Sequence, residues 1–359
     1  MRSGSEPEDS AGVDNPYAVL RNRNFLRYLL SRFIASFGQQ MLTVAVGWEL
    51  YERTHAALSL GLVGLTQMMP MILFTLPAGH VADNFNRKRV VLWMTLLTAL
   101  ASLGLTIASA VGAPVAWMYV CLFVAGTART FLWPASAAFM PQLVSRESFP
   151  RAVTWNTGSF HLSSVAGPAV SGAILAVTHR AATIYAINAV AVMACFGLLV
   201  FVRYTPARLP RERMSLTSLV AGFKFVFENR IILGTITLDL FAVLLGGATA
   251  LLPIYAKDIL QAGPSGLGLL QAALPVGSLV SAAFLAHRPP MQRAGRALLW
   301  AVTMFGSATV LFGISKWFWL SWLMLFSCGA VDNVSVVIRH TLVQLLTPDE
   351  KRGRVSAVN

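Results

Sequence analysis

Four charged residues lie inside long apolar stretches of this chain, where a charge is costly. Arg32 and Arg129 belong to the first part of the sequence, and Asp239 and Asp332 belong to the second. Ionisable side chains in such stretches generally face a polar cavity and mark a path for ions or substrate. Because opposite charges can pair and a carboxylate can take up a proton, these residue types predict a charged gate or a proton-binding site.

Composition indicates that the stretches are membrane spans. The 359 residues are 56% hydrophobic and 12% charged, whereas about a quarter of a soluble domain is charged. A helix needs roughly 20 apolar residues to cross a bilayer, and only a helix satisfies its own backbone hydrogen bonds there. The sequence therefore predicts an all-α membrane protein with about ten spans. They run approximately from Phe25 to Leu50, Leu58 to Leu76, Val90 to Val111, Val115 to Ala138, Val153 to Val177, Ala182 to Val202, Ile231 to Ile254, Gly266 to Ala286, Ala297 to Ile314 and Trp317 to Ile338.

The net charge of +13 is unevenly distributed between the loops. Most of the 28 Lys and Arg residues lie in alternate segments, such as 87–89 and 203–230, that are cytoplasmic if the N-terminus is cytoplasmic. This bias follows the positive-inside rule. The basic charge thus predicts orientation in a plasma membrane (the bacterial inner membrane) and contact with anionic lipids, rather than binding to nucleic acid.

Motifs for catalysis and for resident cofactors are absent from the sequence. The three cysteines are isolated within spans and give neither a disulfide framework nor a metal-ligand spacing. There is no Walker loop, zinc-protease motif or serine elbow. We therefore expect no enzyme activity, no cofactor and no metal site, and a carrier driven by an ion gradient becomes the leading class.

The order of segments predicts two parallel six-helix halves. The segment 141–156, PQLVSRESFPRAVTWN, resembles the segment 343–359, VQLLTPDEKRGRVSAVN, and each follows an even-numbered span. Such a repeat is typical of secondary transporters. We expect the following parts: a disordered cytoplasmic tail (1–24), an N-terminal six-helix half (25–203), a cytoplasmic connector (204–230) and an incomplete C-terminal half with helices seven to ten and the start of eleven (231–359).

The loop between the second and third spans resembles a motif of the major facilitator superfamily. That motif is Gly, three residues, Asp, a base, any residue, Gly and two bases, and Gly79, Asp83, Arg87 and Lys88 match it. Two asparagines, at positions 84 and 86, replace a base and the second glycine. The resemblance implies that Asp83 docks against the N-terminus of helix eleven when the cytoplasmic side is closed.

A second stretch, GPAVSG at 167–172, resembles the antiporter motif in helix five of the superfamily. Gly167, Pro168 and Gly172 match it, and Ser171 replaces one glycine. Ordinary close helix packing is the alternative interpretation, because small residues permit it in any membrane protein. The phrases VAVGWELYERT, AGHVADNFNRKRVV and PQLVSRESFPRAVTWN are most similar to the enterobactin-exporter branch, which implies export of siderophores, macrolides or other amphiphilic drugs.

In the superfamily, helices one, four, seven and ten line the central cavity, and these helices carry the four charges named at the outset. Each charge lies about eight residues from the cytoplasmic end of its helix, or ~12 Å. We predict that Arg129 pairs with Asp332, and Arg32 with Asp239, to form a cytoplasmic gate; static pairs are the alternative. Asp239, Asp332 and then Glu49 are the candidates for proton coupling.

The predicted function is proton-driven efflux of a small molecule by a monomeric carrier. Uptake by symport, and a sensor or scaffold with the same fold, remain alternatives. Trp133 and Phe131, beside Arg129, are candidates for stacking on the substrate, and an interfacial or packing role is the other interpretation of these aromatics.

The end of the sequence gives a further expectation. The repeat maps 354–359 onto the start of the fifth span, and no counterpart of the fifth and sixth spans follows. We expect the natural protein to continue through helices eleven and twelve, and the 359 residues alone not to transport. The downstream gene sequence tests this.

Overall fold

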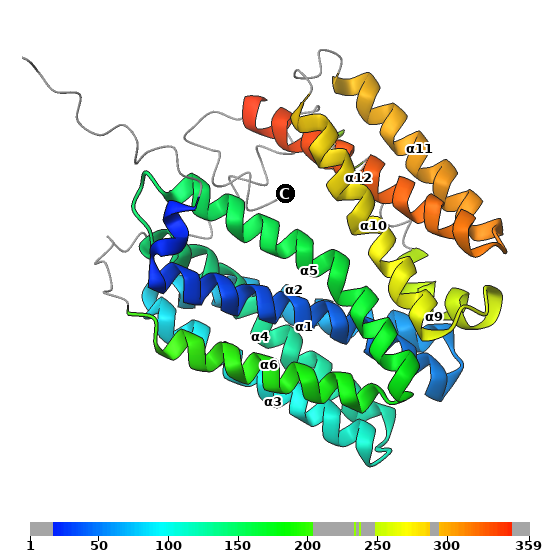
Figure 1. Ribbon diagram of the computed structural model, residues 1–359, viewed down its shortest axis with the longest axis horizontal. Helices are drawn as coiled ribbons and strands as arrows, with labels where there is room; N and C mark the ends of the chain where they lie inside the picture. Colours follow the sequence, from blue (N-terminus) through cyan, green and yellow to red (C-terminus); the bar gives the residue numbers. More distant parts are fainter. Residues whose placement is uncertain (1–16, 204–232, 235–236, 238–247, 288–293, 347–359) are drawn as a thin grey trace, which may run out of the picture. The chain divides into compact units, whose positions relative to one another are not determined.

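A computed structural model describes residues 17–203, 248–287 and 294–346, together with residues 233, 234 and 237, but not the side chains of Asp83, Ala248, Ala294 and 340–346. These residues form helices and no strand, as the sequence predicts (Figure 1). The α-helices are α1 (Arg23–Thr54), α2 (Ala57–Asn84), α3 (Arg87–Ala110), α4 (Val115–Phe139), α5 (Phe149–Thr178), α6 (Ala181–Val200), α9 (Leu252–Ile254), α10 (Gly263–Ala286), α11 (Ala294–Ile314) and α12 (Phe318–Leu346). The shorter elements are the 3-10 helices η2 (Ala18–Arg21), η3 (Met140–Gln142) and η4 (Ala248–Leu251) and the π-helix η5 (Tyr255–Ile259).

Eight helices in the described ranges, α2 to α6 and α10 to α12, are long and apolar enough to cross a bilayer. Helix α1, with 32 residues, corresponds to the first predicted span, and it extends past the apolar run to include charged residues such as Arg23 and Arg53. The predicted span 231–254 falls mostly outside the described ranges, as do the predicted tail and connector. Nine of the ten predicted spans are thus seen as helices.

The turn before α3 explains one departure from the superfamily pattern. Asn86 precedes the first residue of α3, and its side-chain oxygen accepts a hydrogen bond from the backbone N–H of Arg89 at 3.3 Å. An asparagine at this position satisfies one of the free N–H groups at a helix start. Asn86 therefore acts as the N-cap of α3 where the motif has glycine.

The chain forms two compact units that do not coincide with the two sequence halves. Unit 1 comprises residues 1–38, 66–163 and 186–209, and unit 2 comprises residues 39–65, 164–185 and 210–359. Helices α1, α2, α5 and α6 each contribute one part to each unit.

Unit 1 has a core of large apolar side chains in which α3 packs against α4. Phe25 and Phe139 are fully buried in this core, and the Tyr28 hydroxyl donates a hydrogen bond to the Ser136 carbonyl oxygen at 3.2 Å. In unit 2, α12 packs against both α10 and α11. A Cβ atom on Gly277 of α10 would lie 2.9 Å from the Ala330 nitrogen of α12, so glycine is needed where these backbones approach.

Candidate functional site

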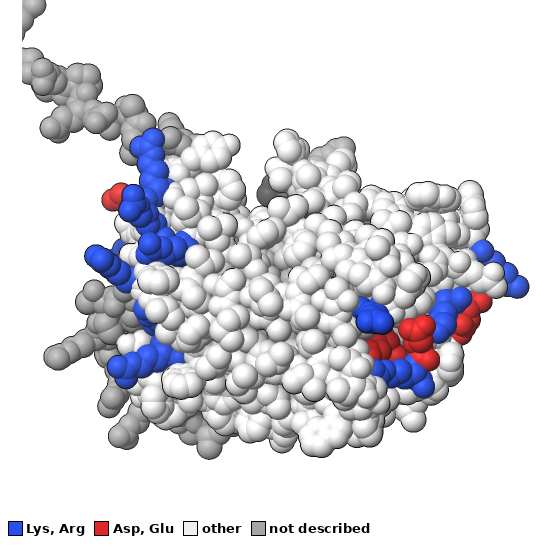
Figure 2. Space-filling view, turned by 60° about the horizontal axis from the view of Figure 1, so that its bottom comes forward, with Lys and Arg blue, Asp and Glu red and all other residues white. Residues whose placement is uncertain are grey.

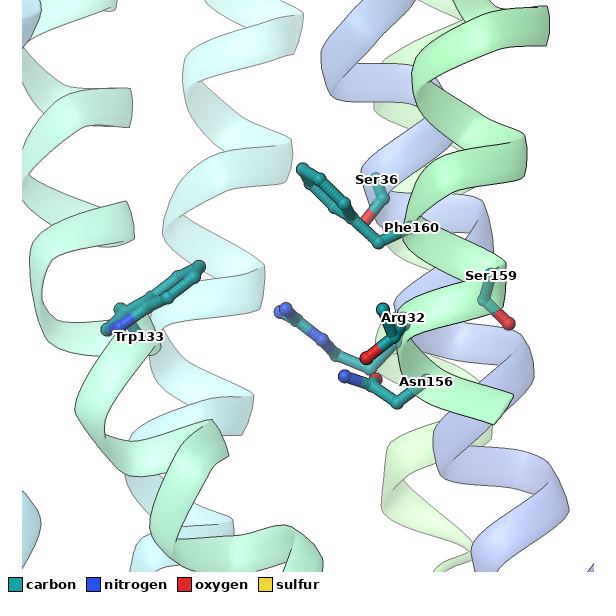
Figure 3. Close-up of a pocket in the computed structure, with 7 residues that line it drawn as sticks. Arg32, Ser36, Trp133, Asn156, Ser159 and Phe160 are labelled. Carbon is teal, nitrogen blue, oxygen red and sulfur yellow. The ribbon is translucent and has the colours of Figure 1, made fainter. Parts of the chain in front are cut away.

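A pocket in unit 1 contains one of the predicted gate residues. Its volume is ≈ 200 Å³. Arg32 of α1, Trp133 of α4 and Phe160 of α5 lie around it, and polar groups come from Ser36, Asn156, Thr157 and Ser159. Figure 3 shows the Arg32 side chain extending from α1 toward Trp133, with Asn156 beside it. Arg32 thus lines a pocket of unit 1, and its predicted place in the central cavity stays a prediction.

Arg129, the second predicted base, has a neutral partner within unit 1. Its guanidinium donates a hydrogen bond to Oε1 of Gln67 in α2 at 3.0 Å. Arg129 is exposed and is not among the residues that line the pocket. An amide oxygen is neutral, so this hydrogen bond satisfies one donor of Arg129 without neutralising its charge.

The two candidate stacking residues are placed differently. Trp133 lines the pocket and is 69% exposed. Phe131 packs instead against Phe74 of α2, with ring centroids 6.1 Å apart. Only Trp133 is therefore positioned to contact a molecule in the pocket.

The predicted acids of the second half are less completely described. Asp332 is partly buried in α12 of unit 2, whereas Asp239 lies outside the described ranges. Since Arg32 and Arg129 belong to unit 1, the two predicted gate pairs stay predictions. Glu49 in α1 is buried and forms an ion pair of 2.5 Å with Arg53, one turn later in the same helix.

The loop motif ends α2 and starts α3. Gly79 and Asp83 are helical residues of α2, and a Cβ atom on Gly79 would contact nothing within 4 Å. The Arg87 guanidinium donates hydrogen bonds to the carbonyl oxygens of Ala82 and Ala138, at 3.4 and 3.3 Å. Lys88 Nζ donates to the Val200 carbonyl oxygen at 2.8 Å.

These three carbonyls belong to the last turns of α2, α4 and α6, where backbone acceptors have no partner within the helix. The motif bases therefore hold three helix ends together, a role that the sequence did not reveal. Basic side chains gather at this end of unit 1 (Figure 2), where Arg21, Arg23, Arg89, Arg146 and Arg203 are exposed. The cluster is what the predicted cytoplasmic orientation requires.

The helix-five motif is a close-packing device in unit 2. A Cβ atom on Gly172 would lie 2.6 Å from the Pro264 carbonyl oxygen and 3.0 Å from the Cα atom of Gly268, both in α10. The Ser171 hydroxyl, fully buried, donates a hydrogen bond of 2.8 Å to the Met41 carbonyl oxygen of α1. Gly167 and Pro168 precede this contact in α5. The serine that departs from the motif thus joins α5 to α1.

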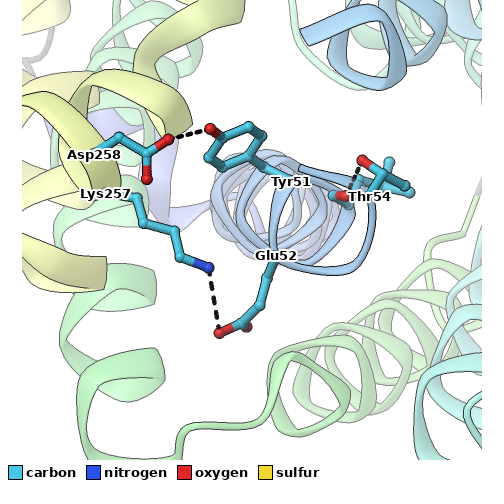
Figure 4. A network of polar contacts seen from close by, with 6 residues as sticks. Tyr51, Glu52, Thr54, Lys257 and Asp258 are labelled. Atoms are coloured by element: carbon cyan, nitrogen blue, oxygen red, sulfur yellow. Dashed lines mark hydrogen bonds and ion pairs between the residues drawn. The ribbon is translucent and has the colours of Figure 1, made fainter. Parts of the chain in front are cut away.

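Unit 2 also contains a polar network between α1 and η5. The Tyr51 hydroxyl of α1 donates a hydrogen bond to the Asp258 carboxylate of η5, and Lys257 Nζ lies 3.7 Å from Glu52 (Figure 4). Lys257 also lies 5.7 Å from the centre of the Trp48 ring. A π-helix inserts an extra residue in its turn and is frequent at functional sites. Here η5 presents both charged residues to α1.

Several of these residues were missed at the sequence level. Asn156, Thr157 and Ser159 gave a weak signal, three polar residues within one apolar run. The Tyr51–Asp258 contact gave none, since its members are 207 positions apart. Within the part of the chain that the structure describes, no group of three or more metal-ligand residues occurs.

The chain is similar to known proteins along most of its length. The family model described as transmembrane secretion effector matches residues 14–359. An enterobactin exporter from Shigella boydii serotype 18 is 28% identical over 338 residues, which cover 93% of this chain and 80% of the relative. An enterobactin exporter from Escherichia coli O81 gives the same values.

Solved structures confirm the predicted major facilitator fold. A bacterial homologue of the human lysosomal transporter Spinster, inward-facing and unoccupied, has a TM-score of 0.70 at 12% identity, with 94% of this chain and 78% of that chain covered. A bacterial homologue of the iron transporter ferroportin, in an inward-facing state, has a TM-score of 0.69 at 17% identity, with 94% and 87% covered.

Proposed function

Because the chain belongs to the transmembrane secretion effector family of the major facilitator superfamily, we propose that it exports an amphiphilic small molecule by alternating access. Family membership makes it an integral membrane transporter and not an enzyme. The observation that supports a transported solute is the pocket of unit 1, in which Arg32, Asn156 and Trp133 combine charge, hydrogen bonding and an aromatic surface. Ligand sites between helices have this character.

Siderophores, macrolides and other drugs are the proposed substrates, by analogy with the enterobactin exporters that the chain resembles. The test is growth of an efflux-deficient bacterium that expresses the complete natural gene, on a panel of siderophores and antibiotics. Resistance supports export. Hypersensitivity would instead identify uptake, and an unchanged growth profile across the panel would favour a sensor or scaffold.

Protons are the proposed coupling ion, with Asp239 and Asp332 as first candidates and Glu49 as the third. A coupling carboxylate must be neutral in one state and charged in another. Substrate movement driven by an imposed pH gradient in proteoliposomes should be lost in the variant whose coupling acid is replaced by its amide (Asp→Asn or Glu→Gln). Retained pH-driven substrate movement in all three variants, Asp239→Asn, Asp332→Asn and Glu49→Gln, would show that none of these acids couples transport to protons.

The proposed cytoplasmic gate pairs Arg129 with Asp332 and Arg32 with Asp239 during the cycle. The double variant Arg129→Asp with Asp332→Arg should restore transport that each single variant loses. A well-expressed double variant with no recovery would refute the pairing. The expected orientation, with the N-terminus and the basic end of unit 1 in the cytoplasm next to anionic lipid, and the monomeric state are part of the same proposal.

A further inference from the structure

The guanidinium of Arg32 carries a positive charge in α1, the helix of the first predicted span, and faces the pocket (Figure 3). A charge at such a position generally pairs with an opposite charge. Among the described residues, no hydrogen bond or ion pair of this guanidinium is found, and the polar side chains that line the pocket with it are Ser36, Asn156, Thr157 and Ser159. None of these neighbours is an acid.

The helices that form the pocket contain no nearby carboxylate. Helices α4 and α5 have no Asp or Glu in their sequences. The acids of α1, Glu49 and Glu52, come 17 and 20 positions after Arg32, or about 25 Å and more along the helix. Among the described residues that line the pocket, Arg32 therefore carries a positive charge and none carries a negative charge. An anion entering the pocket would give Arg32 the negative counter-charge that these helices do not supply.

Aromatic surfaces flank the same space. Trp133 from α4 and Phe160 from α5 line the pocket, and they are 69% and 50% exposed. Exposed rings on two sides of a cation suit a planar group, whose face can stack while its charged edge meets the guanidinium. Arginine binds carboxylates through two parallel hydrogen bonds, which also fixes their orientation.

We propose that this pocket binds an aromatic carboxylate group of the substrate, with Arg32 as its counter-charge and Trp133 as its stacking surface. The inference rests on the proposed transport function and names the substrate class. Asn156 donates a further hydrogen bond to the anion. A neutral amphiphile of the same shape would leave the guanidinium without its charged partner and would bind more weakly.

The test compares two probes that differ only in charge, 2-naphthoate and 2-naphthamide. Binding of each to the purified product of the complete natural gene is measured by titration calorimetry in lipid nanodiscs. The wild-type protein should bind naphthoate at least tenfold more tightly than naphthamide. Equal affinities for the two probes would overturn the proposal, and this comparison requires no variant to fold.

Variants then show which residues produce the preference for naphthoate over naphthamide. Arg32→Gln should abolish the preference for naphthoate, and Arg32→Lys should retain part of it. Trp133→Ala should weaken the binding of both probes by a similar factor. The control Arg89→Gln removes the same charge from an exposed position at the start of α3 and should leave the preference unchanged. If Arg89→Gln lowers the preference as much as Arg32→Gln, overall charge rather than the pocket selects the anion.

The two proposals fail separately. Export of neutral and anionic compounds at equal rates by the intact protein would overturn the anion-binding pocket and leave the transport function standing. Tight, Arg32-dependent naphthoate binding in a protein that moves no compound on the panel would overturn transport and leave the binding site standing.

Discussion

Helix α5 has two parts with opposite properties. Its first part, in unit 1, lines the pocket with Asn156, Thr157 and Phe160. Its second part, in unit 2, carries Ser171 and Gly172 against the backbones of α1 and α10. One part keeps polar and aromatic side chains available to a molecule, and the other removes side chains so that backbones meet. One transporter helix can therefore line a binding pocket with one stretch of its sequence and pack closely against neighbouring helices with another.

The largest expected effect comes from filling the close contact. Gly172→Leu would force a side chain into the α10 backbone, where no flexible group can move aside. Overpacking costs about 1–3 kcal/mol and sometimes more. We therefore expect loss of efflux and a clearly lower melting temperature in detergent.

The matched control is Gly158→Leu, in the pocket part of α5, where an added Cβ atom would contact nothing within 4 Å. It should leave the melting temperature near that of the wild type. If the two variants are equally stable, the contrast between the two parts of α5 is wrong.

The next effect concerns the polar contact between α1 and η5. Tyr51→Phe removes the hydrogen bond to Asp258, which is worth about 1 kcal/mol because the carboxylate is exposed. A cysteine introduced at the buried position Ala256, in a variant without the three native cysteines, reports opening of this contact. Tyr51→Phe should raise its maleimide labelling rate roughly fivefold. An unchanged rate would show that the hydrogen bond does not hold the contact closed.

Features that depend on a single stretch of sequence could be predicted, whereas features that depend on contacts between helices could not. Apolar runs mark spans because the bilayer requires their length, so the predicted run 115–138 became α4 (Val115–Phe139). Helix ends were less accurate: α5 begins at Phe149 rather than Val153, and α12 continues to Leu346 beyond the predicted Ile338. Both helices extend past their apolar run, where hydropathy gives no signal.

Some site residues could likewise be recognised from the sequence, and others could not. Arg32 was recognised because a charge in an apolar run is costly, and Ser171 and Gly172 because they lie in a motif. Asn156 is a single neutral residue whose role depends on what faces it, which one helix does not specify. The bonds from Arg87 and Lys88 to helix-end carbonyls depend on tertiary packing and could not be predicted from loop charge alone.

A smaller effect is expected at the serine that departs from the motif. Ser171→Ala loses the hydrogen bond to Met41, and such bonds in membrane helices contribute about 0.6 kcal/mol and at most ~1.7. The melting temperature should fall measurably while efflux is largely kept. Ser159→Ala, on the pocket part of the same helix, should leave the melting temperature unchanged. If Ser159→Ala lowers the melting temperature more than Ser171→Ala does, the stabilising hydrogen bond of α5 lies in the pocket part of the helix, and the prediction is wrong.

The smallest effect should come from the ion pair between Glu52 and Lys257. Its atoms are 3.7 Å apart, and the side chains are 54% and 26% exposed. Exposed pairs contribute about 0.2–1 kcal/mol and are screened by salt. Glu52→Gln should therefore change the labelling rate of the cysteine at position 256 less than Tyr51→Phe does. The remaining change should vanish at roughly 1 M salt, where the screening length is about 3 Å. If Glu52→Gln exceeds Tyr51→Phe at low salt, the ion pair and not the tyrosine hydrogen bond dominates the contact between α1 and η5.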